Sequence, residues 1–331
     1  MSIDYKTAGV DIAAGEAVVE KIKPYIKRTR TSGVLSEIGL FGGFYDGRFP
    51  DMHQPVLVAS TDGVGTKLKV AFLSGTHDTI GQDLVNHCVN DILACGARPL
   101  FFLDYFATGK LEVDVAADVI KGLAIACEQN GCALLGGETA EMPSMYAEGE
   151  YDLAGTVVGV VEKDLIVNGT NVRSGDVLIA LPSTGLHTNG FSLARAALFP
   201  KYAIDQYVDE LGTTISDALL KVHRSYLTPV LPLVNSGLVH GLSHITGGGI
   251  IGNTSRILPD GLSLSIDWTA WQRPPIFDLI QHAGSVPDAD MQQAFNLGVG
   301  MVAIVAPDKA DNVMDLLSSE RPFIIGTVAT A

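Results

Sequence analysis

The chain is short of aromatic residues, cysteine and positive charge, and each shortage removes a class of protein. Aromatic side chains make up 7% of its 331 residues, and only two are tryptophan. Lys and Arg number 22 against 37 Asp and Glu, which gives a formal net charge of −15. Nucleic acid and anionic membrane surfaces attract basic proteins, so neither is an expected partner.

The cysteines and the apolar runs exclude further classes. The four cysteines, Cys88, Cys95, Cys127 and Cys132, form no C-x-x-C pair and have no zinc-type histidine spacing, so we expect buried thiols in a reducing cytoplasm. The longest apolar run, near Val299 to Ala306, is far too short to span a membrane. The first six residues carry no apolar targeting segment.

What is abundant points to an α/β protein of two domains. The chain is 47% hydrophobic and has 36 glycines, a composition typical of packed strands and helices joined by many tight turns. The chain is longer than a domain with a single hydrophobic core usually is. A polar segment at 163–174, with an Asn168-Gly169 turn signal, predicts domains at 1–168 and 169–331.

Strand and helix patterns alternate through both halves. In the first we expect strands at 55–60, 99–107, 132–135 and 153–161, and helices at 81–95 and 113–130. In the second we expect strands at 176–181, 262–266, 301–306 and 323–328, and helices after 190 and at 215–234, 252–258 and 310–318. The glycine-rich residues 31–54 predict either a lid over a ligand or a disordered connection.

Three carboxylates between residues 61 and 140 stand beside glycines or small polar residues near the ends of apolar segments. They are Asp62, Asp91 and Glu138. Carboxylates beside exposed backbone amides suit an enzyme that handles Mg²⁺ and phosphate. The segment around Asp62 is not a P-loop, because Ser60 replaces the first glycine and Thr66 intervenes before Lys67. It also lacks the third glycine of the dinucleotide fingerprint.

Each carboxylate also has a plainer interpretation. Asp62 could belong to an ordinary Asp-Gly turn. Asp91 lies on the rim of an apolar helical stripe, where it either forms a salt bridge with Arg98 or Lys67 or shares a metal with Asp62. Glu138, after Gly136 and Gly137, either ends a strand at a turn or lies beside a triphosphate.

Three further segments are candidate binding or catalytic sites. His187, amid hydroxyls and glycines at 183–190, is either a solvated or capping histidine or a catalytic one. Thr246 to Gly249 precede a predicted helix and form either a hinge or a phosphate cradle. The basic run at 21–30, which contains Lys27, is either a solvated helix face or an anion site.

Taken together, the motifs resemble those of the phosphoribosylformylglycinamidine cyclo-ligase (aminoimidazole ribonucleotide synthetase) family. The resemblance spans nearly the whole chain, in order. Its motifs lie at 5–12, 61–67, 77–81, 89–91, 101–105, 136–143, 187–192, 244–249 and 295–301.

The resemblance implies a two-domain synthetase fold of the α/β (α+β) class. The N-terminal mixed sheet would form a dimer-spanning barrel, and the C-terminal α/β domain would contribute to the substrate site. The implied reaction is the ATP-dependent closure of formylglycinamidine ribonucleotide to aminoimidazole ribonucleotide, with Mg²⁺ and release of ADP and phosphate. The protein would be a homodimer.

The resemblance also implies roles for individual residues. Asp62, Asp91 and Glu138 would hold the metal, and His187 and Lys27 would be catalytic. The ATP-binding set would comprise Lys67, Asp62, Asp91, Gly136, Gly137, Glu138 and Thr139. The substrate phosphate would lie at Thr246, Gly247, Gly248 and Gly249.

Two other hypotheses remain at this stage. One is a related enzyme such as thiamine-monophosphate kinase or the synthetase part of formylglycinamidine ribonucleotide amidotransferase. The other is a nucleotide-binding protein without turnover. Apolar strands at 99–106 and 153–161 have little to cover them and should be paired or packed. The resemblance implies that a second copy covers them, in a dimer joined through residues 55–160 with Phe102 and Val158 at the interface.

Overall fold

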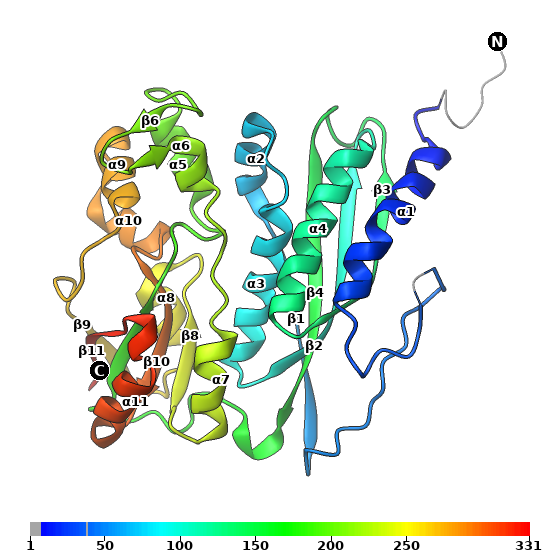
Figure 1. Cartoon of the computed structure of the whole chain (residues 1–331). Coiled ribbons are helices and arrows are strands. Elements are labelled where there is room, and N and C mark those ends of the chain that lie inside the picture. Colours follow the sequence, from blue (N-terminus) through cyan, green and yellow to red (C-terminus); the bar gives the residue numbers. More distant parts are fainter. Residues whose placement is uncertain (1–7, 38) are drawn as a thin grey trace.

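The computed structural model describes residues 8–37 and 39–331, which form two sheets with helices around them (Figure 1). The expected α/β organisation with a mixed first sheet is confirmed. Tyr5, Lys6 and Thr7, at the start of the first motif, lie outside the described residues. Within the described part of the chain, no helix has the length and apolar character to cross a membrane.

The first sheet has four strands in the order β1-β4-β2-β3: β1 (Pro55–Gly63), β4 (Tyr151–Glu162), β2 (Arg98–Thr108) and β3 (Ala133–Glu141). β2 and β3 run parallel because α4 (Val113–Gln129) crosses between them, and the other neighbours are antiparallel. β1 and β3 are therefore the two edges of this sheet.

Helices cover only one face of this sheet. α1 (Ile12–Arg28), α3 (Ile80–Ala94) and α4 pack there, and Figure 1 shows them side by side in front of the strands. The short α2 (Leu68–Ser74) precedes α3. On the other face, large apolar side chains such as Leu57, Leu103 and Tyr105 remain exposed, Leu57 by 64%.

The second half is built on a five-stranded antiparallel sheet in the order β8-β10-β5-β11-β9. Its strands are β8 (Gly241–His244), β10 (Val299–Val305), β5 (Val177–Pro182), β11 (Phe323–Thr330) and β9 (Leu262–Ile266). Its helices are α5 (Phe191–Leu198), α6 (Ile215–Leu219), α7 (Leu227–Asn235), α8 (Gly249–Thr254), α9 (Pro275–Gly284), α10 (Asp288–Ala294) and α11 (Ala310–Leu316). A small ribbon pairs β6 (Tyr207–Val208) with β7 (Thr213–Thr214). α3 packs against both β8 and α7, so it lies between the two halves.

Two predictions about local structure are wrong. The single long helix expected at 215–234 is two short helices, α6 and α7, separated by an irregular segment at 220–226. The motif at Gly136–Thr139 is not a loop, because it continues β3 in register with β2. Both corrections bear directly on the candidate site.

Candidate active site

One face of α3 joins the two halves through polar side chains. Its residues at positions i, i+3, i+4, i+7 and i+8 share this face, and they are Asp83, Asn86, His87, Asn90 and Asp91. The first four are buried, which is unusual for such residues unless every polar atom is bonded.

Three of them, Asp83, Asn86 and Asn90, bond to backbone groups of the irregular segment at 220–226. Asp83 Oδ1 accepts the N–H of His223 at 2.7 Å, and Asn86 Nδ2 donates to the His223 carbonyl at 2.7 Å. Asn90 accepts the N–H of Tyr226 at 2.9 Å and donates to the carbonyl of Arg224 at 2.8 Å. Side chains of α3 thus replace the helical hydrogen bonds that this segment does not form.

Asp62 and Asp91 meet around one imidazole. His87 Nε2 lies 2.8 Å from Asp62 Oδ2 and 3.7 Å from Asp91 Oδ2. Burial alone would lower the pKa of His87, but the hydrogen bond to Asp62 and the charge of Asp91 raise it. Burial likewise opposes ionisation of Asp62, but the hydrogen bond from His87 lowers its pKa. The expected convergence of these two carboxylates on one point is present.

Asp91 makes its close hydrogen bond with a histidine from the second half, whose pKa is lowered by burial. Its Oδ1 lies 2.8 Å from His244 Nδ1, and its Oδ2 accepts the hydroxyl of Ser60 at 3.1 Å. The predicted alternatives, ion pairs with Arg98 or Lys67, are wrong, because Arg98 pairs with Asp51. The side chains of Asp62 and Asp91 are 42% and 29% exposed, so both are partly accessible from outside.

Four histidines gather where the halves meet. They are His87, His187, His223 and His244, and successive rings lie 4.0 to 5.3 Å apart. His223 Nε2 is 3.0 Å from His244 Nε2, and Thr188 Oγ1 lies between His87 Nδ1 at 2.7 Å and His223 Nδ1 at 3.3 Å. Two sets offer possible metal ligands within 4.8 Å of one another: His187, His223 and His244, and His87, Asp91 and His244.

His187 has an unusual backbone and an unpaired nitrogen. Its φ of 61° is left-handed, which is strained for a non-glycine residue. The ring is 1% exposed, its Nε2 accepts the N–H of Thr184 at 3.2 Å, and its Nδ1 has no hydrogen-bond partner among the described residues. Burial, together with nearby positive groups, lowers its pKa well below the usual range. A neutral ring with its proton on Nδ1 is therefore a donor without an acceptor.

Lys67 does not face a ligand, contrary to the expected phosphate role. The residue is fully buried, and its Nζ forms an ion pair with Asp83 Oδ2 at 2.7 Å. The same Nζ donates to the carbonyls of His187 at 3.1 Å and Lys221 at 2.9 Å. Its three protons are thus occupied by protein groups, and Lys67 holds the second half, including the backbone of His187, against the first.

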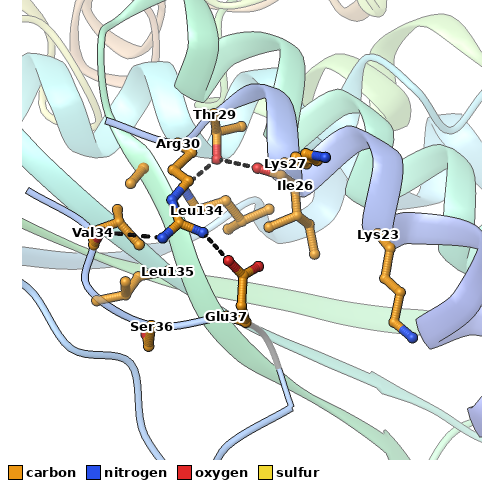
Figure 2. Close-up of a pocket in the computed structure, with 11 residues that line it drawn as sticks. Lys23, Ile26, Lys27, Thr29, Arg30, Val34, Ser36, Glu37, Leu134 and Leu135 are labelled. Carbon is orange, nitrogen blue, oxygen red and sulfur yellow. Dashed lines mark hydrogen bonds and ion pairs between the residues drawn. The ribbon is translucent and has the colours of Figure 1, made fainter. Parts of the chain in front are cut away.

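A separate pocket lies at the other edge of the sheet, where α1 meets β3 (Figure 2). It has a volume of about 330 Å³, an apolar floor that includes Ile26 and Leu134, and three cations, Lys23, Lys27 and Arg30. Arg30 pairs with Glu37 and donates to the carbonyl of Val34, as the dashed lines show. Among the described residues, Lys27 has no ion-pair partner, so its charge is available to an anion.

Gly136, Gly137, Glu138 and Thr139 belong to this same edge. Gly136, Gly137 and Glu138 line a second pocket, of about 550 Å³, beside the loop at 39–43. This pocket shares Glu37 and Leu135 with the pocket around Lys27. Neighbouring strands are about 4.8 Å apart, so β3 and β1 lie on the order of 14 Å apart across the sheet. One chain therefore does not bring Glu138 to Asp62 and Asp91.

The backbone groups of the turn at Thr246–Gly249 are largely bonded to other protein groups. Gly248 N–H donates to the carbonyl of Gln293 at 3.0 Å, and Gly249 N–H to that of Thr246 at 3.2 Å. Asn253 Nδ2 donates to three carbonyls of the turn at 2.8 to 3.2 Å. α8, which follows, has only six residues. The phosphate role of this turn stays a prediction.

Sequence reasoning missed several members of the interdomain cluster. His87, His223 and Asp83 were not expected there, and His244 was seen only as the start of a glycine motif. The polar spacing along α3 was a usable signal, because Asp83, Asn86, His87 and Asn90 recur at helical intervals on one face. No local signal marks His223, since it lies outside any regular element.

Comparisons with known proteins agree with this architecture. The family model "AIR synthase related protein, N-terminal domain" matches residues 49–161, and "AIR synthase related protein, C-terminal domain" matches residues 173–331. The boundary expected at 168/169 stays a prediction.

Solved structures support the fold. The hydrogenase maturation protein HypE of E. coli matches with a TM-score of 0.68 at 17% identity over 96% of this chain and 91% of that one. Thiamine-monophosphate kinase of Stenotrophomonas maltophilia K279a matches with a TM-score of 0.65 at 17% identity over 95% and 94%.

Closer relatives share one name, phosphoribosylformylglycinamidine cyclo-ligase. The protein of that name from Myxococcus xanthus (strain DK1622) is 54% identical over 99% of this chain and 96% of its own length. The one from Sorangium cellulosum (strain So ce56) is 51% identical over 100% and 96%. With identity at this level from end to end, the chain belongs to the phosphoribosylformylglycinamidine cyclo-ligase family.

Proposed function

We propose that this chain is an ATP-dependent cyclo-ligase of de novo purine biosynthesis, which converts formylglycinamidine ribonucleotide to aminoimidazole ribonucleotide and releases ADP and phosphate. The observation that carries the proposal is the 54% identity across the full chain to a cyclo-ligase. In this reaction ATP phosphorylates the formamide oxygen of the substrate. The amidine nitrogen of the substrate then attacks the carbon that bears this oxygen. The imidazole ring closes, and the oxygen leaves as part of the phosphate.

His187 is the residue that we expect to act on the reacting amide of the substrate. Its Nδ1 has no protein partner, and its lowered pKa keeps the ring neutral, so it can donate to an oxygen that gains negative charge. The hydrogen bond from Lys67 to the His187 carbonyl and the left-handed backbone at His187 fix the position of the ring. The substrate phosphate would bind at Thr246–Gly249, which follows His244 directly in the chain.

Asp62 and Asp91 fit a role as ligands of Mg²⁺. Both carboxylates lie beside His87, both side chains are partly exposed, and both have lowered pKa values, which keeps them ionised. When bound, Mg²⁺ neutralises charge on the ATP phosphates during transfer. Glu138 would join this set only from another chain, because its own strand is at the far edge.

Lys27 and the glycine-rich edge of β3 are the candidate binding site for ATP. Lys27 supplies an unpaired cation, and Gly136 and Gly137 permit close approach of a phosphate or base to the backbone. The candidate ATP-binding residues thus lie at one edge of the sheet, and Asp62, Asp91 and His187 lie at the opposite edge.

In a homodimer, the two sets of residues could come together from different chains. The exposed face of the sheet carries Leu57, Leu103 and Tyr105, and two copies packed through this face about a two-fold axis would cover it. Such packing also places the β3 edge of one copy near the β1 edge of the other. We therefore propose a dimer-spanning barrel in which each active site uses both chains.

The test is release of ADP that depends on formylglycinamidine ribonucleotide. Coupled detection of ADP with this substrate, with thiamine monophosphate and with neither should give a signal only with the first. A signal with thiamine monophosphate instead would identify a kinase. Binding of ATP without any turnover would identify a nucleotide-binding protein and contradict the proposal.

A further inference from the structure

Asp104, in β2, is a buried carboxyl with no partner from another residue. It is 9% exposed and lies on the helix-covered face of the sheet with Phe102 and Phe106. Among the described residues no cation and no other side chain bonds to it, and its one favourable contact is with its own backbone. Burial raises the pKa of Asp104 to about 7. A buried polar group without a partner calls for an explanation, and a ligand is one.

The carboxyl borders open space. Asp104 lines the pocket of about 550 Å³ at the β3 edge, together with Leu103, Leu135 and the loop residues Leu40 and Phe41. A side chain at Gly137 would place its Cβ 2.2 Å from Asp104 Oδ1, so glycine is required to leave the carboxyl uncovered. The pocket therefore combines apolar lining residues with three carboxyls, of which Asp104 is the buried one.

This pocket adjoins the cationic pocket of Figure 2. The two pockets share Glu37 and Leu135, and Lys27 lines the cationic pocket. A ligand that spans both would need a planar apolar part with hydrogen-bonding edges at one end and negative charge at the other. A nucleoside triphosphate has this form.

We propose that Asp104 recognises the adenine base of ATP, its carboxyl pairing with the 6-amino group and the adjacent ring nitrogen N1. This inference rests on the proposed use of ATP. A protonated carboxyl has one donor and one acceptor side by side, which matches the N1 acceptor and amino donor of adenine. The phosphates would then extend toward Lys27.

The surroundings of Asp104 favour its protonated form. Cys127 of α4 is the titratable neighbour on the helix side, and burial raises its pKa too, so it stays neutral. α1 contributes Val19 to the pocket wall, and Glu37 and Glu138 are the other carboxyls that line the pocket. None of these groups is a cation that would favour ionised Asp104.

The experiment compares direct binding of ATP and of purine riboside triphosphate, which lacks only the 6-amino group. Titration calorimetry would use the wild type, Asp104→Ala and Asp104→Asn, each checked for folding by thermal unfolding. We expect the wild type to prefer ATP by roughly tenfold, the scale of a buried hydrogen bond left unmade. Asp104→Ala should lose both this preference and roughly tenfold in ATP affinity. Asp104→Asn, whose amide also has one donor and one acceptor face, should keep both.

The pH dependence gives a second readout on the same proteins. As pH rises above 7, wild-type Asp104 loses its proton and its negative charge repels N1, so ATP affinity should fall, whereas Asp104→Asn should not show this fall. Equal ATP preference in all three proteins would overturn the proposal, as would wild-type ATP affinity in Asp104→Ala. Wild-type protein that binds ATP with the expected preference but releases no ADP would contradict the proposed reaction and leave this inference standing.

Discussion

The two edges of the first sheet differ in how their polar groups are used. At the β1 edge, Lys67, Asp83, Asn86 and Asn90 are buried and bonded to protein partners in the second half. At the β3 edge, Lys27 has no ion-pair partner among the described residues, and Asp104 bonds only to its own backbone. A folded chain pairs the polar groups that hold its shape. These four groups of the first edge therefore maintain the structure, whereas Lys27 and Asp104 of the second are open to a ligand.

Like Asp62 and Asp91, His187 is a group of the β1 edge that stays available to a ligand. It lies among the bonded groups of the β1 edge, yet its Nδ1 is unpaired. The paired groups around it, Lys67 above all, fix its backbone so that the one free atom has a defined position. Rigid support of a reactive group is a general requirement of active sites. Four experiments, from the largest expected effect to the smallest, test whether the edges differ in this way.

The largest effect should come from Lys67→Met, which leaves the buried Asp83 without its partner and so raises the pKa of this carboxyl further above about 6. We expect the free energy of unfolding to fall by about 3 to 5 kcal/mol, the cost of breaking a buried ion pair by removing one partner. Urea denaturation measures it. Lys69→Met is the matched control, because its half-exposed ion pair with Glu150 should contribute under ~1 kcal/mol. Similar losses in both variants would contradict a structural role specific to Lys67.

Val158→Lys tests the open face of the sheet. Val158 pairs with Ala59 and Phe101 on this face, so a charge there would be buried without a partner in the proposed dimer. Sedimentation should show dissociation, with a cost on the order of 3 kcal/mol. Leu73→Lys, at an exposed position on α2, is the control. Phe102, the other position considered from sequence, is unsuitable because it is fully buried against the helices. A monomeric wild type with full activity would refute the dimer.

His187→Ala should reduce turnover by roughly 10²-fold or more, the scale of a lost acid–base group. ATP affinity should stay unchanged, because the candidate ATP groups lie at the other edge. Steady-state kinetics and calorimetry measure the two quantities, and His282→Ala, at the exposed end of α9, is the control. If ATP affinity collapsed while turnover of bound ATP persisted, the role assigned to His187 would be wrong.

The smallest effect should come from Lys27→Ala. Loss of one charge-assisted contact to phosphate should weaken ATP binding roughly tenfold while the fold stays intact. Calorimetry measures it against Lys121→Ala, which removes an exposed cation of α4 outside the pocket. Unchanged affinity after loss of Lys27 would remove ATP phosphate from this pocket.

Regular elements with strong hydrophobic patterns were predictable, and segments without local pattern were not. Strands β1, β2 and β4 and helices α3 and α4 lie within a few residues of their predicted positions. The helix expected at 215–234 failed because residues 220–226 satisfy their backbone groups through Asp83, Asn86 and Asn90, more than 130 positions earlier in the chain. A local pattern cannot report a partner so distant in sequence.

The sequence by itself determined the family, the α/β class and the candidate carboxylates, because motif order and hydrophobic periodicity are local properties. Only the tertiary structure decided which of these residues meet. It joined Asp62 and Asp91 through His87, and it separated both from Glu138 by the width of the sheet. It also converted Lys67 from an expected phosphate ligand into a buried contact between the two halves. The physical reason is that strand order and domain packing set the distances between side chains, and neither is encoded in the residues adjacent to each one.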